Sequence, residues 1–344
     1  MSRSRSRLDL ESIRRLTELA DYAVPFAVRV VANLGVADHL DKPRPVGELA
    51  EATGSDSDAL YRVLRVLAGK GIFHEDPSGW FGPSPLSELL RTDHPMSLRG
   101  LCYLMPHDIR AWAAFEHTVR TGESAFDHVH GQDYWTYLAG HPDQGARFDE
   151  SQQSATRLEL LTAVRVYDWA SLTTIADLGG GNGAFLAGLL SRYPHLRGVL
   201  VDLPHVVAHA PPVLAAAGVD DRCDIIPADF FTIPPPTADA YILARCLYGW
   251  DDDHVIRLLR SIRTAMTPDS RLLIVEPLAD LDEAATVTVD LWMAVLSPGR
   301  VREPSQIKAL LGEVGLDIHR LYRTFPFPII DARPLSAESH HGAV

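Results

Sequence analysis

The chain has 344 residues, 46% of them hydrophobic, which predicts two domains with a sizeable buried core. Its formal charge of −13 gives an acidic surface that repels phosphate backbones, so nucleic acid is not an expected partner. Three widely spaced cysteines, no apolar run of the roughly 18 residues that span a bilayer, and a basic N-terminus without an apolar core together indicate a cytoplasmic protein that does not associate with membranes.

Residues 1–101 predict a mainly helical domain. The predicted elements are a helix over Arg29–Leu40 broken at Gly35, two helices over Val46–Gly54 and Ser55–Gly71, and a hairpin over Ile72–Gly82. This order is the winged-helix pattern, which serves either DNA binding or packing between subunits. Acidic residues surround the few basic ones of the second helix, so the dimerisation interpretation is favoured.

Residues 102–169 predict further helices that carry many aromatic side chains. Most of these rings are expected in the core, and a few are expected to line a pocket for a flat ligand. We interpret the region as a helical linker that lines a substrate site.

From residue 170 to 334, strands alternate with helices, which predicts an α/β domain with a parallel, doubly wound sheet of the Rossmann-like kind. Strands are predicted within 173–178, 196–204, 223–231, 238–247 and 270–278, and helices over 252–266, 287–296 and 304–316. Residues 335–344 are expected to form a loose tail.

The segment Asp177–Gly183, DLGGGNG, joins the first predicted strand to a helix. Gly179, Gly181 and Ala184 also satisfy the dinucleotide signature GxGxx(G/A), and Asp202 ends the next strand, where an acidic residue binds a ribose. By itself this motif leaves the cofactor open.

Two features favour a ligand without phosphate. Asp177, just before the glycines, would repel a pyrophosphate and suits a cationic amino group. Asp229 and Phe230, after the third predicted strand, offer a carboxylate for an adenine amino group and a ring for stacking. Adenosine joined to an amino acid, with no phosphate, describes S-adenosylmethionine.

In chain order, these motifs resemble the small-molecule O-methyltransferases that join an N-terminal winged-helix dimerisation domain to a C-terminal Rossmann-like S-adenosylmethionine domain. The resemblance covers nearly the whole chain and rests on the segments VRVVANLGVADHL, YDWASLTTIADLGGGNGAFL, HLRGVLVDLP, ADFF, GWDDDHVIRLLRSI, PDSRLLIVEPL and PGRVR. It implies a homodimer. It also implies cofactor contacts from the glycine loop, from Asp202 to the ribose hydroxyls, from Asp229 and Phe230 to adenine, and from the strand end near Ala244.

The sequence departs from the family pattern at the catalytic pair. The family's fourth strand ends in Leu-His-Asp-Trp with a histidine base, whereas Tyr248 occupies that position here. The glutamate that orients the histidine is replaced by Val301, and Glu276 remains as a third acidic position. This double replacement resembles the branch of carminomycin 4-O-methyltransferase and aclacinomycin 10-hydroxylase, in which methyl transfer proceeds by proximity and one member carries out a decarboxylating hydroxylation.

We therefore expect an S-adenosylmethionine-dependent enzyme that methylates a phenolic hydroxyl of an aromatic polyketide-type natural product. The alternative is an enzyme that binds the cofactor without methyl transfer and performs a decarboxylative hydroxylation or a pericyclic or cyclisation step. By family register, Trp292 and Met293 would line the acceptor site. Arg300 or Arg302 would either meet a substrate carboxylate or be surface charges.

Tyr248 has three candidate roles. A phenol with a reference pKa of about 10 is a poor base at neutral pH, so hydrogen bonding to a substrate carbonyl or stacking is favoured. The acidic stretch Asp251–Asp253 is interpreted as the N-terminal cap of a helix rather than a metal site, and no metal is expected.

Overall fold

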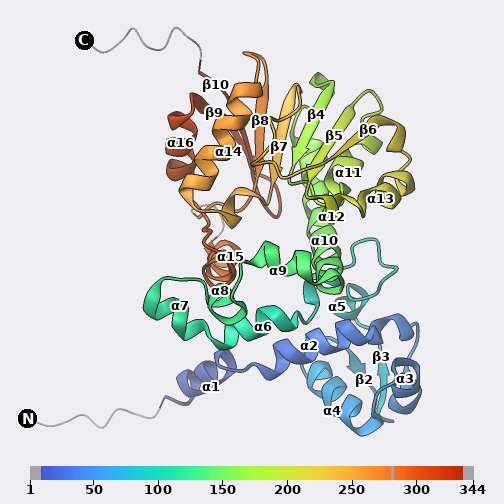
Figure 1. Cartoon of the computed structure of the whole chain (residues 1–344). Helices are drawn as coiled ribbons and strands as arrows, with labels where there is room; N and C mark the ends of the chain where they lie inside the picture. Colours follow the sequence, from blue (N-terminus) through green and yellow to red (C-terminus); the bar gives the residue numbers. More distant parts are fainter. Residues whose placement is uncertain (1–8, 280–282, 336–344) are drawn as a thin grey trace, which may run out of the picture. The chain divides into compact units, whose positions relative to one another are not determined.

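The computed structural model describes residues 9–279 and 283–335 and contains two compact units, residues 1–104 and 105–344, which are described separately (Figure 1). The predicted tail, residues 335–344, lies outside the described residues except for Leu335. Among the helices of the described part, none has the length and apolar character that a membrane span requires.

The N-terminal unit has the predicted helices and hairpin. Helix α2, Ala23–Leu34, ends at Gly35, whose φ of +69° is the left-handed conformation that favours glycine. The other elements are α1 (Leu10–Leu19), α3 (Val46–Thr53), α4 (Ser57–Ala68), α5 (Pro85–Glu88), β1 (Arg44–Pro45), β2 (His74–Glu75), β3 (Trp80–Gly82) and the short 3₁₀ turns η1 (Val36–His39) and η2 (Gly100–Cys102). Strand β1 was not predicted; it pairs with β3 to give the order β1-β3-β2.

The second unit is built on a seven-stranded sheet with the order β6-β5-β4-β7-β8-β10-β9. Its strands are β4 (Thr174–Leu178), β5 (Arg197–Asp202), β6 (Cys223–Pro227), β7 (Ala240–Ala244), β8 (Arg271–Val275), β9 (Leu316–Tyr322) and β10 (Ile329–Pro334). Strands β4 to β8 are parallel, as predicted. Strands β5 and β6 lie on one side of β4, and the next two strands along the chain, β7 and β8, lie on its other side. This confirms the Rossmann-like α/β expectation.

Strands β9 and β10 were not predicted. They form an antiparallel pair, and β10 also pairs antiparallel with β8, so it lies between β8 and β9. Strand β9 interrupts its apolar residues with charged ones, and β10 carries Asp331, whose fully buried carboxylate pairs with Arg333. Such polar residues weaken the periodic signal on which strand prediction depends.

Helices cover both faces of this sheet because successive strand residues point to opposite sides. In β4, Ile175 packs with α10, α11 and α13, whereas Ala176 packs on the opposite face with α14 and α16. Figure 1 shows α11 and α13 on one side of the sheet and α14 and α16 on the other. The bounds are α10 (Pro142–Val166), α11 (Ala184–Arg192), α12 (Pro204–Val207), α13 (Ala210–Ala216), α14 (Asp252–Ala265) and α16 (Pro304–Glu313).

The remaining helices of this unit form a separate aromatic cluster. They are α6 (Pro106–Ala113), α7 (Phe115–Thr121), α8 (Ala125–His130), α9 (Tyr134–Gly140) and α15 (Glu283–Leu296). The 3₁₀ turns η3 (Trp169–Ser171), η4 (Asp220–Arg222) and η5 (Leu247–Gly249) lie outside this cluster. Phe126 and Tyr137 are buried in the cluster, and Val295 joins it from α15. Helix α9 from this cluster and the N-terminal part of α10 face the strand ends where the site lies.

Candidate functional site

The glycine loop after β4 adopts a conformation that other residues rarely take. Gly179, Gly181 and Gly183 have φ of +74°, +63° and +77°, and the N–H of Gly181 donates to Asp202 Oδ2 at 2.8 Å. At Gly180, a Cβ atom would lie 2.6 Å from the Asp177 carboxyl group. The loop thus brings its backbone N–H groups and two carboxylates together at the carboxyl ends of β4 and β5.

Asp177 is fully buried, and within residues 9–279 and 283–335 neither of its carboxylate oxygens has a hydrogen-bond partner. Burial, with a smaller contribution from the nearby Asp202 carboxylate, raises the pKa of Asp177 to about 7. A buried carboxylate without a partner is unfavourable unless a cation meets it. This orphaned group fits the amino group of the S-adenosylmethionine that the sequence predicts.

The other predicted cofactor residues surround the same space. Asp202 Oδ1 accepts the N–H of Leu203 at 2.7 Å, which fixes the carboxylate at the end of β5. Asp229 Oδ1 accepts the N–H of Phe231, and a Cβ on Gly179 would lie 3.2 Å from the Phe230 ring. The Phe230 ring therefore lies against the glycine loop, where an adenine would stack.

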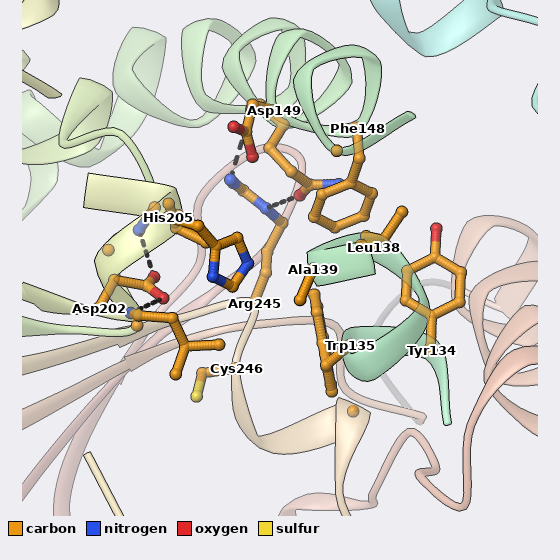
Figure 2. A pocket seen from close by; sticks show the side chains of 18 of the residues that line it. Tyr134, Trp135, Leu138, Ala139, Phe148, Asp149, Asp202, His205, Arg245 and Cys246 are labelled. Carbon is orange, nitrogen blue, oxygen red and sulfur yellow. Dashed lines mark hydrogen bonds between the residues drawn. The ribbon is translucent and has the colours of Figure 1, made fainter. Parts of the chain in front are cut away.

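A cavity of about 650 Å³ joins this cluster to an aromatic wall. All seven predicted cofactor residues line it: Asp177, Gly179, Gly181, Asp202, Asp229, Phe230 and Ala244. The opposite wall comes from α9 and α10 and includes Tyr134, Trp135, Leu138, Ala139 and Phe148. Figure 2 shows Asp202 and His205 on one side, Trp135 and Tyr134 on the other, and Arg245 and Cys246 between them.

Arg245, the residue after β7, was not predicted as a site residue. Its guanidinium pairs with Glu159, and it donates to Gln152 Oε1 at 3.1 Å and to Thr156 Oγ1 at 3.0 Å. Those three partners lie on α10, so Arg245 joins the strand end to the helix that walls the cavity. The sequence signal for this residue was an arginine directly after a predicted buried strand. Its partners lie 86 to 93 positions earlier in the chain, and no feature of the sequence indicated that they would contact it.

Tyr248 lies in η5 and, although partly buried, is not among the residues that line the cavity. Burial raises the pKa of its phenol well above the ordinary value, so the hydroxyl stays protonated at neutral pH. Glu276 Oε2 accepts the N–H groups of Leu247 and Tyr248 at 3.0 and 3.2 Å. Glu276 therefore binds the backbone of this turn, and burial raises its pKa to about 7.

The predicted substrate residues are not among those that line the cavity. Arg302 is 2% exposed; it donates to Asp252 Oδ1, to the Leu247 carbonyl at 3.1 Å and to the Trp250 carbonyl at 2.8 Å. Its guanidinium is thus bound by the protein and ties η5 to the start of α14. Arg300 is exposed and does not line the cavity.

The two α15 residues predicted for the acceptor site also lie outside the cavity lining. Trp292 packs edge-on against Trp112 with ring centroids 5.3 Å apart. Met293 Sδ lies 3.8 Å from the Ser297 hydroxyl. The predicted cap at Asp251 is confirmed, because its carboxylate accepts the N–H of His254 at 2.9 Å.

Two family models match the chain. An O-methyltransferase domain matches residues 112–317, and an O-methyltransferase dimerisation domain matches residues 17–93.

Curated relatives cover most of the chain. The phenazine O-methyltransferase PhzM of Lysobacter antibioticus is 38% identical over 93% of this chain and 95% of its own length. The mitomycin biosynthesis 6-O-methyltransferase of Streptomyces lavendulae is 39% identical over 86% of each chain. Aclacinomycin 10-hydroxylase RdmB of Streptomyces purpurascens is 32% identical over 88% of this chain and 83% of its own, so the chain is more similar to the other two enzymes than to this hydroxylase.

Among solved structures, the O-methyltransferase NcsB1 from neocarzinostatin biosynthesis, in complex with S-adenosylmethionine and 2-hydroxy-5-methyl naphthoic acid, superimposes with a TM-score of 0.80 at 29% identity. The match covers 96% of this chain and all of that one. These relatives carry the same fold over nearly the whole length, including both units.

Proposed function

The chain belongs to the S-adenosylmethionine-dependent O-methyltransferase family, and from that premise we propose that it methylates a phenolic hydroxyl of an aromatic polyketide-type natural product. One observation carries the proposal: a single cavity is bounded by the glycine loop at one end and by the rings of Trp135 and Phe148 at the other. A donor held at the loop and a flat acceptor held against the rings would share that space.

The residues present fit the cofactor. Asp177 would meet its amino group, Asp202 its ribose hydroxyls, and Asp229 with Phe230 its adenine. When bound, S-adenosylmethionine supplies an activated methyl group on a sulfonium. The chain's part is to hold the acceptor oxygen in line with that methyl, and orientation of this kind lowers a barrier by about 7–11 kcal/mol.

We propose that no residue of η5 acts as a base. Tyr248 supports this because its phenol is held protonated by burial, and Val301, which is 7% exposed, carries no group to orient a proton acceptor. Glu276 accepts backbone N–H groups of the turn and is not among the cavity-lining residues. The acceptor would then need a hydroxyl that ionises readily, such as a phenol beside a carbonyl.

A reaction without methyl transfer has no observation in its favour. Decarboxylative hydroxylation needs a substrate carboxylate, and the two arginines predicted to meet one, Arg300 and Arg302, do not line the cavity. A pericyclic or cyclisation step has no group among the described lining residues that distinguishes it from methylation.

We also propose a homodimer assembled through the N-terminal unit. The dimerisation-domain match over residues 17–93 supports it, and so does α1, which has no buried residue in the single chain. Leu10, Leu16 and Leu19 are 68–69% exposed there. Light scattering of the purified protein measures the assembly state directly.

A turnover assay tests the function. Purified protein, S-adenosylmethionine and a panel of hydroxylated polycyclic aromatics are incubated, and both products are measured by mass spectrometry. Methyl transfer gives S-adenosylhomocysteine in equal amount to a product heavier by one methylene unit, and the Asp202→Ala variant, which loses the ribose contact, is the control. Consumption of the aromatic compound with the cofactor unchanged contradicts the proposal.

A further inference from the structure

We propose that the cavity takes a planar phenol that carries no carboxylate or other anionic group, because its lining is acidic and offers an anion no available cation. This inference rests on the proposed methyl transfer and deepens it by naming the substrate class. It separates this chain from enzymes whose acceptors are aromatic acids, such as the relative solved with a naphthoic acid.

Most of the charged side chains that line the cavity are acidic. Six aspartates line the cavity: Asp127, Asp133, Asp149, Asp177, Asp202 and Asp229. Arg245 is the single arginine or lysine among the described residues of the lining. The cofactor would add two cations, its sulfonium and its amino group, and one carboxylate of its own. Asp177 is the partner argued above for the amino group. An anionic acceptor would therefore enter a field of its own sign.

The Arg245 guanidinium is already bound by other groups of the protein. Its guanidinium pairs with Glu159, which is 1% exposed, and donates to side chains at Gln152 and Thr156. Diverting Arg245 to a substrate carboxylate would leave Glu159 buried without its partner, which is strongly unfavourable. The ion pair is thus part of the wall.

The histidines of the lining offer no substitute on the acceptor side. His209 Nδ1 lies 2.9 Å from Asp149 Oδ2, and His254 Nδ1 lies 2.8 Å from Asp251 Oδ1. His205 lies on the side of Asp202, across the cavity from Trp135 (Figure 2). None of these three histidines therefore serves as a cationic partner for an acceptor at the aromatic wall.

The acceptor end itself is apolar and ring-lined. Trp135 packs edge-on against Phe148 and Tyr134, with ring centroids 5.6 and 5.5 Å apart, and Leu138 and Ala139 complete the wall. A flat neutral ring loses little hydration on entering such a wall, whereas a carboxylate loses its water without receiving a counter-ion. Asp133, at the start of α9, adds a like charge nearby.

A matched pair of ligands tests this. A dihydroxynaphthalene and its carboxylated counterpart, a dihydroxynaphthoic acid, are titrated calorimetrically into full-length protein saturated with S-adenosylhomocysteine, at pH 8, where an ordinary imidazole is neutral. The diol is expected to bind at least tenfold more tightly than the acid. Equal or tighter binding of the acid, or no binding of either compound, overturns the inference.

A gained cation sharpens the test. Ala139 lines the cavity from α9, is exposed and carries no side-chain hydrogen bond, so Ala139→Arg adds a guanidinium without removing a contact. This variant is expected to reduce the ratio of diol affinity to acid affinity at least fivefold. Ala139→Gln, of similar length without charge, is expected to leave that ratio within twofold of the wild-type value. A ratio that both variants change equally shows a steric effect and contradicts the electrostatic one.

Turnover separates this inference from the proposed function. Tight binding of the diol without S-adenosylhomocysteine formation from S-adenosylmethionine overturns the proposed methylation and supports the neutral-ligand inference. Methylation of the acid in preference to the diol supports the proposed methylation and overturns the neutral-ligand inference.

Discussion

Arg245 at the end of β7 and Glu159 on α10 form an ion pair in which the carboxylate side chain is 1% exposed. Arg245 has a φ of +53°, a left-handed conformation that costs a residue with a side chain of the order of 1 kcal/mol or more. The surrounding contacts hold it there. The pair thus fixes the distance between the sheet and the helix that carries Phe148 and Gln152.

Breaking this pair from one side should destabilise the protein strongly. Arg245→Met leaves Glu159 buried and unpaired, and we expect the free energy of unfolding to fall by about 3–5 kcal/mol. Urea denaturation of the ligand-free protein measures the change. The double variant Arg245→Met/Glu159→Leu should recover more than half of the loss, and simple additivity of the two single changes would contradict the assignment.

Asp177→Asn should weaken cofactor binding and remove the rise in affinity between pH 6 and pH 8. The pKa of Asp177 is about 7, so the carboxylate is mostly neutral at pH 6 and ionised at pH 8. The amino group of a free amino acid has a pKa above the peptide N-terminal value of about 7.7–8.0, so it remains a cation over this range. Affinity for S-adenosylhomocysteine should therefore rise between pH 6 and pH 8 as Asp177 ionises.

Calorimetry across this range measures both effects. The asparagine variant should bind at least tenfold more weakly at pH 7.5 and lack the rise between pH 6 and 7.5. Asp224→Asn, at an exposed position on strand β6, which β5 separates from β4 in the sheet, is the matched control and should retain the wild-type profile. An unchanged profile in Asp177→Asn would show that this carboxylate does not meet the ligand.

Gly299→Ala should disrupt the loop that supports η5. A Cβ atom there would lie 2.0 Å from the Tyr248 carbonyl oxygen and under 3 Å from the Gly249 backbone, so the backbone itself would have to move. We expect the free energy of unfolding to fall by about 3 kcal/mol, or the protein to fail to fold, because overpacking against rigid backbone costs stability at the upper end of the usual range. Thermal unfolding followed by circular dichroism measures it.

Gly312→Ala is the matched control for that change. Gly312 lies inside α16, and its added methyl group would meet nothing within 4 Å. Replacing a helical glycine by alanine should raise the stability by about 0.5–1 kcal/mol. Equal effects of the two substitutions would mean that glycine replacement as such, rather than the contact with Tyr248, determines the outcome.

Tyr248→Phe should leave catalysis nearly intact. A phenol whose pKa is raised by burial does not accept a proton at neutral pH, so removal of the hydroxyl should change kcat by less than about threefold. Single-turnover kinetics with a phenolic acceptor measure the chemical step. A loss of a hundredfold or more, with KM unchanged, would assign the hydroxyl a direct part in the reaction.

The sequence could predict that the proposed cofactor residues lie together, because they occupy adjacent segments of the parallel sheet. Asp177 and the glycines lie in one strand-turn-helix segment, and Asp202 and Asp229 follow the next two strands, so parallel topology alone places them at one edge. Five parallel strands carried enough apolar periodicity to be recognised. The same rule does not reach residues whose partners lie far along the chain.

The aromatic wall of the cavity depends on tertiary packing. Trp135 and Phe148 were two aromatics among many in residues 102–169, and nothing in their spacing separated wall from core. Arg302 was assigned a substrate role from its motif, yet its buried guanidinium binds Asp252 and two carbonyl groups. Burial decides whether a charge serves a ligand or the fold, and burial emerges only when distant segments meet.

The position of β10 between β8 and β9 has a consequence for synthesis on the ribosome. Strand β8 can pair with β7 once both have emerged, but its other edge has no partner until residues 329–334 have emerged. During that interval the nascent sheet exposes unpaired N–H and C=O groups beside a strongly apolar strand, a template for pairing with another chain. Ribosome-stalled chains whose emerged part ends before Ile329 should therefore require chaperones to remain in solution, and those held by a linker long enough for Pro334 to leave the ribosome should not.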